Sequence, residues 1–138
     1  MSMYPEGKIL VIDDDTRRRQ LCERILIEEG FAVTAVPEGF SAIRAAQSVR
    51  FALAITAVGL PGTLDGLTTM RQLRSRQPWL RALFTGEVAC RPQCPDRNRD
   101  DFIPSPFDRR DLIGGVFELL QREVAHAEPD RRDRSRAG

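Results

Sequence analysis

The 138-residue chain has no excess of charge of either sign and no long apolar run. Its 21 lysines and arginines nearly balance its 20 aspartates and glutamates, so the formal net charge is +1. Such a balance provides no overall attraction to nucleic acid or to a membrane surface. No apolar run approaches the length of a membrane span, and we expect no secretory leader. We therefore expect a cytoplasmic protein with no nucleic-acid and no membrane partner.

Cysteine and histidine are also scarce, with three cysteines and one histidine in the chain. An odd cysteine count in a chain long enough for a full hydrophobic core does not indicate a disulfide framework. Cys90 and Cys94 lie close in sequence, but zinc usually takes four ligands. Cys22 and His126 are far from them in the predicted fold. The sequence favours two plain loop cysteines, or a redox pair, over a zinc site, and it places Cys22 in the core.

Five short apolar runs recur along the chain, and the first of them, KILVI, is rich in β-branched residues. Such nearly continuous runs are typical of strands that are buried on both faces of a parallel sheet. We expect strands over residues 8–12, 31–36, 51–58, 80–85 and 101–104.

Amphipathic segments alternate with these runs. The first is expected to begin at a cap formed by Asp15 or Thr16 and to stop at Gly30, which accepts the left-handed conformation of helix ends. Its core-facing residues are Leu21, Cys22, Ile25 and Leu26. Further helices are expected over 38–49, 66–77 and 108–125, the first of them with Phe40, Ile43, Ala46 and Val49 on its apolar face.

The segment between the fourth and fifth strands, residues 86–100, lacks this periodicity. Pro92 and Pro95 interrupt it, so it holds one helical turn at most. The remaining alternation of strands and helices predicts an α/β fold, a doubly wound parallel sheet with helices on both faces. We expect one domain over residues 1–125 and a disordered, charged tail over 126–138.

Polar residues follow several of the predicted strands. In parallel sheets of this kind, sites form at the carboxyl ends of the strands. Asp13 and Asp14 follow the first strand, Ala57 lies at the end of the third, Thr85 ends the fourth and Ser105 follows the fifth. We therefore expect these residues to converge.

The segments ILVIDDD, GLPGTLDG, LFTG and FIPSPFDRRDL, in this order and spacing, resemble the receiver domain of two-component response regulators over residues 7–122. The resemblance implies a CheY-like, flavodoxin-like sheet of five strands in the order 2-1-3-4-5, with the fourth helix shortened or replaced by a loop. It also implies a magnesium-binding acidic pair at Asp13 and Asp14. Thr85 and Phe102 take the positions of the family's switch residues.

Two positions depart from the family pattern. The phosphoacceptor position, four residues before the proline of the turn, is Ala57, and the lysine position, just before a proline–phenylalanine pair, is Ser105. Alanine has no nucleophilic carboxylate, and serine has no charge with which to hold phosphoryl oxygens. Magnesium also prefers a full oxygen shell. We therefore expect no cofactor, and at most weak magnesium binding at Asp13 and Asp14.

These residues predict a stand-alone, degenerate receiver of a two-component or phosphorelay system. It would be a pseudo-receiver that is not an enzyme and that acts by phosphorylation-independent protein–protein interaction. The family signals through a face formed by its fourth helix, fifth strand and fifth helix. The corresponding partner surface here comprises Phe102, Ile103, Arg109, Arg110 and Ile113. The expected partner is a histidine kinase, another signalling protein or a second copy of the chain.

Two alternatives stay open. A phosphorelay receiver could accept phosphate at a non-standard residue. Asp65 is the nearest acid, although its place before a helix fits a turn or a cap, and Thr56 would point away from the side of Ala57. A small metal-dependent enzyme could use Asp13 and Asp14.

Residues 17–19 are three consecutive arginines in the first turn of the first helix. They could contact phosphate, but positive charge is mildly unfavourable at that end of a helix. We expect them to form a solvated face rather than a nucleic-acid site, since no recognisable reader of nucleic acid follows.

Overall fold

A computed structural model of the protein describes residues 7–92 and 98–122. Within them, five strands form one parallel sheet in the order β2-β1-β3-β4-β5, which confirms the predicted fold class. The strands are β1 (Lys8–Ile12), β2 (Ala32–Val36), β3 (Leu53–Ala57), β4 (Arg81–Gly86) and β5 (Asp100–Pro104).

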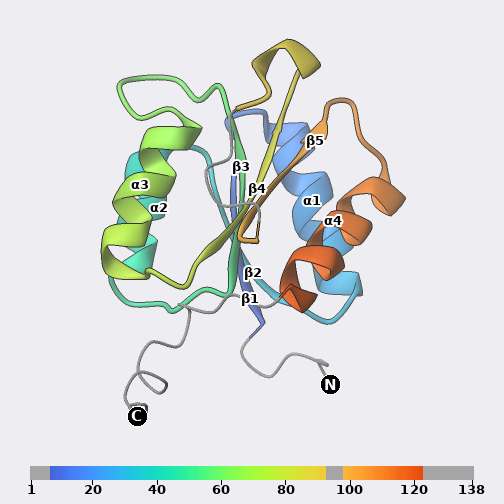
Figure 1. Ribbon diagram of the computed structural model, residues 1–138, viewed down its shortest axis with the longest axis horizontal. Helices are drawn as coiled ribbons and strands as arrows, with labels where there is room; N and C mark the ends of the chain where they lie inside the picture. Colours follow the sequence, from blue (N-terminus) through green and yellow to red (C-terminus); the bar gives the residue numbers. More distant parts are fainter. Residues whose placement is uncertain (1–6, 93–97, 123–138) are drawn as a thin grey trace.

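Helices cover both faces of this sheet, α1 and α4 on one side and α2 and α3 on the other (Figure 1). Each side has its own cluster of buried apolar residues, so the molecule has three layers and two cores. The helices are α1 (Thr16–Glu28), α2 (Gly39–Ala46), α3 (Gly66–Arg76) and α4 (Arg109–Gln121).

The central strands are apolar on both faces because each face meets a layer of helices. In β1, Leu10 and Ile12 belong to the core under α2 and α3, whereas Ile9 and Val11 belong to the core under α1 and α4. All four side chains are at most 1% exposed. This two-sided burial is why the strand reads as an unbroken apolar run rather than an alternating one.

The ends of α1 follow the predicted signals. The side chain of Asp15 caps the helix and accepts a hydrogen bond from the backbone N–H of Arg18 over 3.0 Å. Gly30, just beyond the helix, has a φ of 98°, a conformation that suits glycine. The predicted inner face is buried, with Cys22 1% and Ile25 4% exposed.

The apolar face predicted for α2 is wrong at Phe40, which is 59% exposed. The helix is buried through small residues, the predicted Ala46 and also Ala42, and Ile43 is partly buried against the same core. The reason is a close approach of α2 to α3, since a Cβ atom at Gly39 would lie 2.3 Å from the hydroxyl oxygen of Thr69. The small residues on α2 permit this approach, and Phe40 lies outside the contact.

Between β4 and β5, the described residues include one short 3₁₀ helix, η1 (Val88–Cys90). Arg91 follows it and places its guanidinium 4.7 Å from the ring centroid of Phe102. The buried carboxylate of Asp100 at the start of β5 pairs with Arg74 of α3. Arginine side chains therefore cover part of this side of the sheet.

Three features of the sequence lie outside the described residues, namely Cys94, His126 and the tail over 126–138. The predicted domain boundary at residue 125 lies there as well. In the part of the chain that the structure describes, no helix is long and apolar enough to cross a membrane.

Candidate functional site

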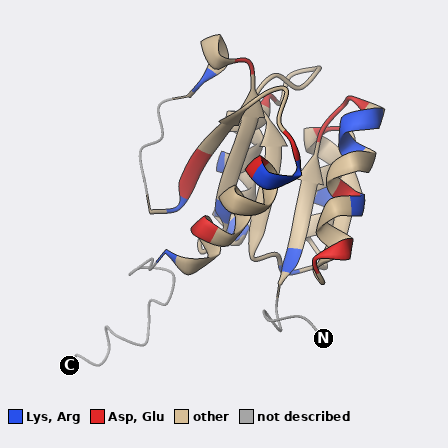
Figure 2. Ribbon diagram, turned by 90° about the vertical axis from the view of Figure 1, so that its right-hand side faces the viewer, with Lys and Arg blue, Asp and Glu red and all other residues tan. Residues whose placement is uncertain are grey.

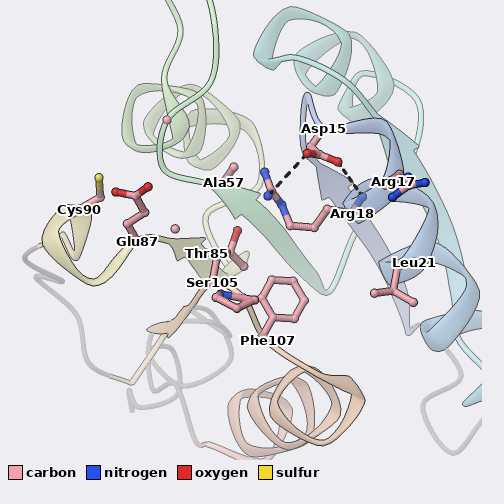
Figure 3. Close-up of a pocket in the computed structure, with 13 residues that line it drawn as sticks. Asp15, Arg17, Arg18, Leu21, Ala57, Thr85, Glu87, Cys90, Ser105 and Phe107 are labelled. Atoms are coloured by element: carbon pink, nitrogen blue, oxygen red, sulfur yellow. Dashed lines mark hydrogen bonds and ion pairs between the residues drawn. The ribbon is translucent and has the colours of Figure 1, made fainter.

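The carboxyl ends of the strands bring the predicted residues together at one edge of the sheet. Ala57 pairs with Thr85 in the register of β3 and β4. The backbone N–H of Ser105 donates to the carbonyl oxygen of Gly86 over 2.7 Å, which holds the end of β5 beside β4. Ala57, Thr85 and Ser105 line a common cavity of about 730 Å³ (Figure 3).

The end of β3 presents a methyl group to this cavity. Ala57 lines it, whereas the neighbouring Thr56 is fully buried and donates its hydroxyl to the carbonyl oxygen of Ala57 over 3.0 Å. The following turn closes tightly on the strand, since a Cβ atom at Gly66 would lie 2.2 Å from the same carbonyl oxygen. The backbone that would present a nucleophile is therefore formed, and its side chain carries no reactive group.

Asp65 has a local role in the same turn. It is the N-cap of α3, and its Oδ1 accepts a hydrogen bond from the backbone N–H of Thr68 over 2.8 Å. It is not among the residues that line the cavity. The prediction that Asp65 acts as a helix cap is confirmed.

No lysine lies near Ser105. The sequence contains a single lysine, Lys8. It begins β1, whereas the cavity lies at the carboxyl ends of the parallel strands. At the position where the resemblance implies a lysine, the cavity is lined by Ser105, which carries no charge.

The two acids that follow β1, Asp13 and Asp14, have different surroundings. Asp13 is buried, at 3% exposure, and Asp14 is exposed. Both carboxylate oxygens of Asp13 accept hydrogen bonds from Arg18, Oδ2 from Nε over 2.6 Å and Oδ1 from Nη2 over 2.9 Å. Oδ1 also accepts from the backbone N–H of Asp15 over 2.9 Å, and Arg19 donates to the backbone carbonyl oxygen of Asp13 over 2.8 Å.

Arg18 reaches Asp13 because of its place in α1. It lies three residues beyond the cap, and side chains in a helix lean toward the N-terminus. The hydrogen bond to Asp13 raises the pKa of Arg18 above its usual value, so the guanidinium stays charged. The expectation that residues 17–19 form a solvated face is therefore wrong for Arg18, and also for Arg19, which is half-buried and donates to the carbonyl oxygen of Asp13. The sequence did contain a signal for this ion pair, because Arg18 lies in the first turn of a helix that begins just after the acidic end of β1.

This donor set does not fit a magnesium ion. Mg²⁺ requires oxygen ligands in a near-octahedral shell. Ala57 offers no side-chain oxygen, and the carboxylate of Asp13 already faces a guanidinium. Across residues 7–92 and 98–122, no group of three or more histidine, cysteine, aspartate or glutamate side chains could hold a metal ion.

Phe102 does not lie on the surface where the sequence placed it. It is 4% exposed, belongs to the core under α2 and α3, and has the guanidinium of Arg91 over its ring. Successive side chains of a strand point to opposite faces, and Ile103 accordingly packs against the other core, under α1 and α4. Phe102 is therefore removed from the predicted partner surface.

The other residues of that surface are accessible. Ile103 and Ile113 are half-buried and Arg110 is exposed. Arg109 pairs with Glu28 and Glu29 at the end of α1, over 2.7 and 3.0 Å. Figure 2 shows acidic and basic residues interspersed on the helices of this side.

Comparison with known proteins gives the same family for sequence and fold. The chain matches the response regulator receiver domain over residues 9–116. It is 34% identical over 116 residues to Protein PetR of Rhodobacter capsulatus, which is 83% of this chain and 48% of that protein. It is also 34% identical over 124 residues to Transcriptional regulatory protein ResD of Bacillus subtilis, which is 88% of this chain and 51% of that one. The chain thus spans about half the length of these curated relatives.

Solved structures agree with this match. A response regulator receiver protein from Sinorhizobium medicae superposes with a TM-score of 0.74 at 28% identity, and the match covers 85% of this chain and 97% of that one. The receiver domain of NtrX from Brucella abortus superposes with a TM-score of 0.72 at 27% identity, covering 83% and 99%. With its sheet order, its strand-end cavity and these matches, the chain belongs to the response regulator receiver domains of two-component systems.

Proposed function

We propose that this receiver domain acts in the cytoplasm through protein–protein contact that needs no phosphorylation, and that it is not an enzyme. The observation that carries the proposal is Ala57, which ends β3 and lines the cavity. An acyl phosphate forms only when a carboxylate oxygen attacks phosphorus, and a methyl group has no electron pair to donate. The five-stranded parallel sheet of the receiver fold surrounds a position that cannot accept a phosphoryl group.

The charge distribution of the cavity supports the proposal. Ser105 brings a hydroxyl where a lysine would stabilise phosphoryl oxygens, and the only lysine in the sequence, Lys8, begins β1. The guanidinium of Arg18 is engaged by Asp13. Neither the nucleophile nor the lysine of the family reaction is therefore present.

The surface that we propose for contact with a partner, the α4–β5 surface, comprises Ile103, Arg109, Arg110 and Ile113. It combines two half-buried isoleucines with the exposed Arg110 and with Arg109, which already pairs with Glu28 and Glu29. Such a mixture suits a partner surface that offers apolar and acidic groups. The partner proposed is a histidine kinase, another signalling protein or a second copy of the chain.

Affinity capture from the native cell extract tests this proposal, with the protein as bait, with and without acetyl phosphate and Mg²⁺. We expect the same partner to be retained at the same level in both conditions. Arg110→Glu should lower retention about tenfold or more. Arg71→Glu is the matched control, because Arg71 is exposed on α3, on the opposite side of the sheet, and its replacement should change nothing. A partner that is retained only after treatment with acetyl phosphate contradicts the proposal.

One observation favours the alternative, a phosphorelay receiver with a non-standard acceptor. The carboxylate-bearing residues Asp15 and Glu87 line the cavity. Asp15 is engaged as the cap of α1, but Glu87, just after β4, caps no helix with its side chain. Glu87 is therefore the residue to replace first if a phosphorylated form of the protein is found.

A further inference from the structure

Arg18 places a fixed positive charge at the strand-end site. Its Nε and Nη2 donate to the two carboxylate oxygens of Asp13, and the same side chain lines the cavity together with Ala57 (Figure 3). Asp13 is 3% exposed, so its charge is largely removed from water and requires a partner of opposite sign. The ion pair is therefore part of the folded structure at the end of β1, and it contributes more than an ion pair between two fully exposed side chains does.

Both carboxylate oxygens of Asp13 already accept hydrogen bonds. Oδ2 accepts from Arg18, and Oδ1 accepts from both Arg18 and the backbone N–H of Asp15. A divalent cation would have to displace a guanidinium that is tethered only five residues along the same chain, and therefore competes at a high effective concentration. It would also lack the oxygen that Ala57 does not supply.

We infer that Arg18 is a built-in cation, which takes the place of a metal ion beside Asp13 and keeps divalent cations out of the site. Arg18 acts here as a positioning residue, because it neutralises Asp13 and orients its carboxylate. The end of β1 then keeps one charge state at any concentration of Mg²⁺ found in a cell. The inference rests on one part of the proposed function, namely that no phosphoryl group enters the cavity. Its test uses neither a phosphoryl donor nor a partner, so its result can contradict the inference without contradicting the proposed function.

Titration with Mn²⁺ alone, followed by the electron paramagnetic resonance signal of the free ion, tests the inference. The variants are Arg18→Leu, Arg18→Leu combined with Asp13→Asn, and the control Arg24→Leu. Arg24 is exposed on the same helix, α1, and is not among the residues that line the cavity. We expect Arg18→Leu to bind Mn²⁺ about tenfold or more tightly than the natural protein, because a positive charge beside Asp13 is removed. Arg24→Leu should match the natural protein, and Asp13→Asn should abolish the binding gained.

The melting temperature is a second measurement, which reports the effect of the variant on folding. Arg18→Leu leaves Asp13 buried without its partner, so we expect a lower melting temperature that Mn²⁺ raises again, whereas Mn²⁺ leaves that of the natural protein unchanged. If Arg18→Leu does not fold, Arg18→Gln decides the question, because it removes the charge but keeps an amide that can donate a hydrogen bond to Asp13. It should bind Mn²⁺ more tightly than the natural protein. Mn²⁺ binding by the natural protein as tight as that of the folded Arg18 variants overturns the inference.

Discussion

At the scale of single residues, burial controls the chemistry of Cys22. Desolvation raises the pKa of its thiol to about 12, whereas the pKa of a cysteine in an unfolded chain is about 8.5. Between these values the folded state holds a proton that the unfolded state has lost, so the contribution of Cys22 to stability is present below the lower value and is lost as pH rises. We predict that the free energy of unfolding in urea falls between these pH values, and that it falls less steeply for Cys22→Ala. Equal slopes for the two proteins would contradict the prediction.

The capping role of Asp65 makes a second prediction at this scale. Asp65→Ala removes the acceptor for the backbone N–H of Thr68 and should lower the free energy of unfolding by about 1 kcal/mol. Asp65→Asn keeps a side-chain oxygen and should cost much less. Urea denaturation of the two variants checks this order. A loss from Asp65→Asn as large as that from Asp65→Ala would show that the carboxylate has another role.

A third prediction concerns the restoration of phosphate acceptance. Ala57→Asp with Ser105→Lys supplies the two missing groups, but the new carboxylate enters a cavity that Arg18 also lines. We expect the new carboxylate to pair with that guanidinium, so the double variant should stay close to background in acetyl phosphate and Mg²⁺. Addition of Arg18→Leu should allow an acyl phosphate to form. Intact mass measures both, and full acceptance by the double variant would show that Arg18 does not block the site.

Much of the site was predictable from the sequence, because the ends of the strands and the spacing of the turn place Ala57, Thr85 and Ser105 in one cavity. Arg18 was not, since its role depends on the direction of one long side chain at a helix start rather than on spacing. The burial of Phe102 follows from the alternation of side chains along β5, which the prediction of a partner surface did not apply.

At the scale of elements, two adjacent glycines of α4, Gly114 and Gly115, differ in the space around them. One can therefore report helix propensity alone, and the other reports packing as well. A Cβ atom at Gly114 meets nothing within 4 Å, whereas one at Gly115 would lie 3.2 Å from Cδ2 of Leu83, a fully buried residue of β4. We predict that Gly114→Ala raises the free energy of unfolding by about 0.5–1 kcal/mol. Gly115→Ala should gain less or lose stability, because α4 must move away from the sheet. Urea denaturation of both variants checks this, and an equal gain from the two would contradict the close contact.

The strands and helices themselves were predictable because their patterns are strong. Two-sided burial makes β1 an unbroken and β3 a nearly unbroken apolar run, and α1 is bounded by the cap at Asp15 and by Gly30. Prediction failed at Phe40, where periodicity alone does not reveal that α2 and α3 pack through small residues.

At the scale of the whole molecule, the sheet order explains why substitutions far apart in sequence affect one site. β3 lies between β1 and β4, and β5 lies beside β4, so all the carboxyl ends meet at one edge. Arg18, Ala57 and Ser105 come from three separate segments and line the same cavity. The sheet therefore brings these segments together, with Ala57 and Ser105 lining the cavity and Arg18 paired with Asp13 after β1.

The most direct test of this account is the intact mass of the natural protein after incubation with acetyl phosphate and Mg²⁺. The variant that combines Ala57→Asp, Ser105→Lys and Arg18→Leu serves as the positive control. The account predicts that the natural protein keeps its original mass while the control gains one phosphoryl group. A phosphoryl adduct on the natural protein that disappears in Glu87→Gln, Asp65→Asn or Asp13→Asn would contradict it.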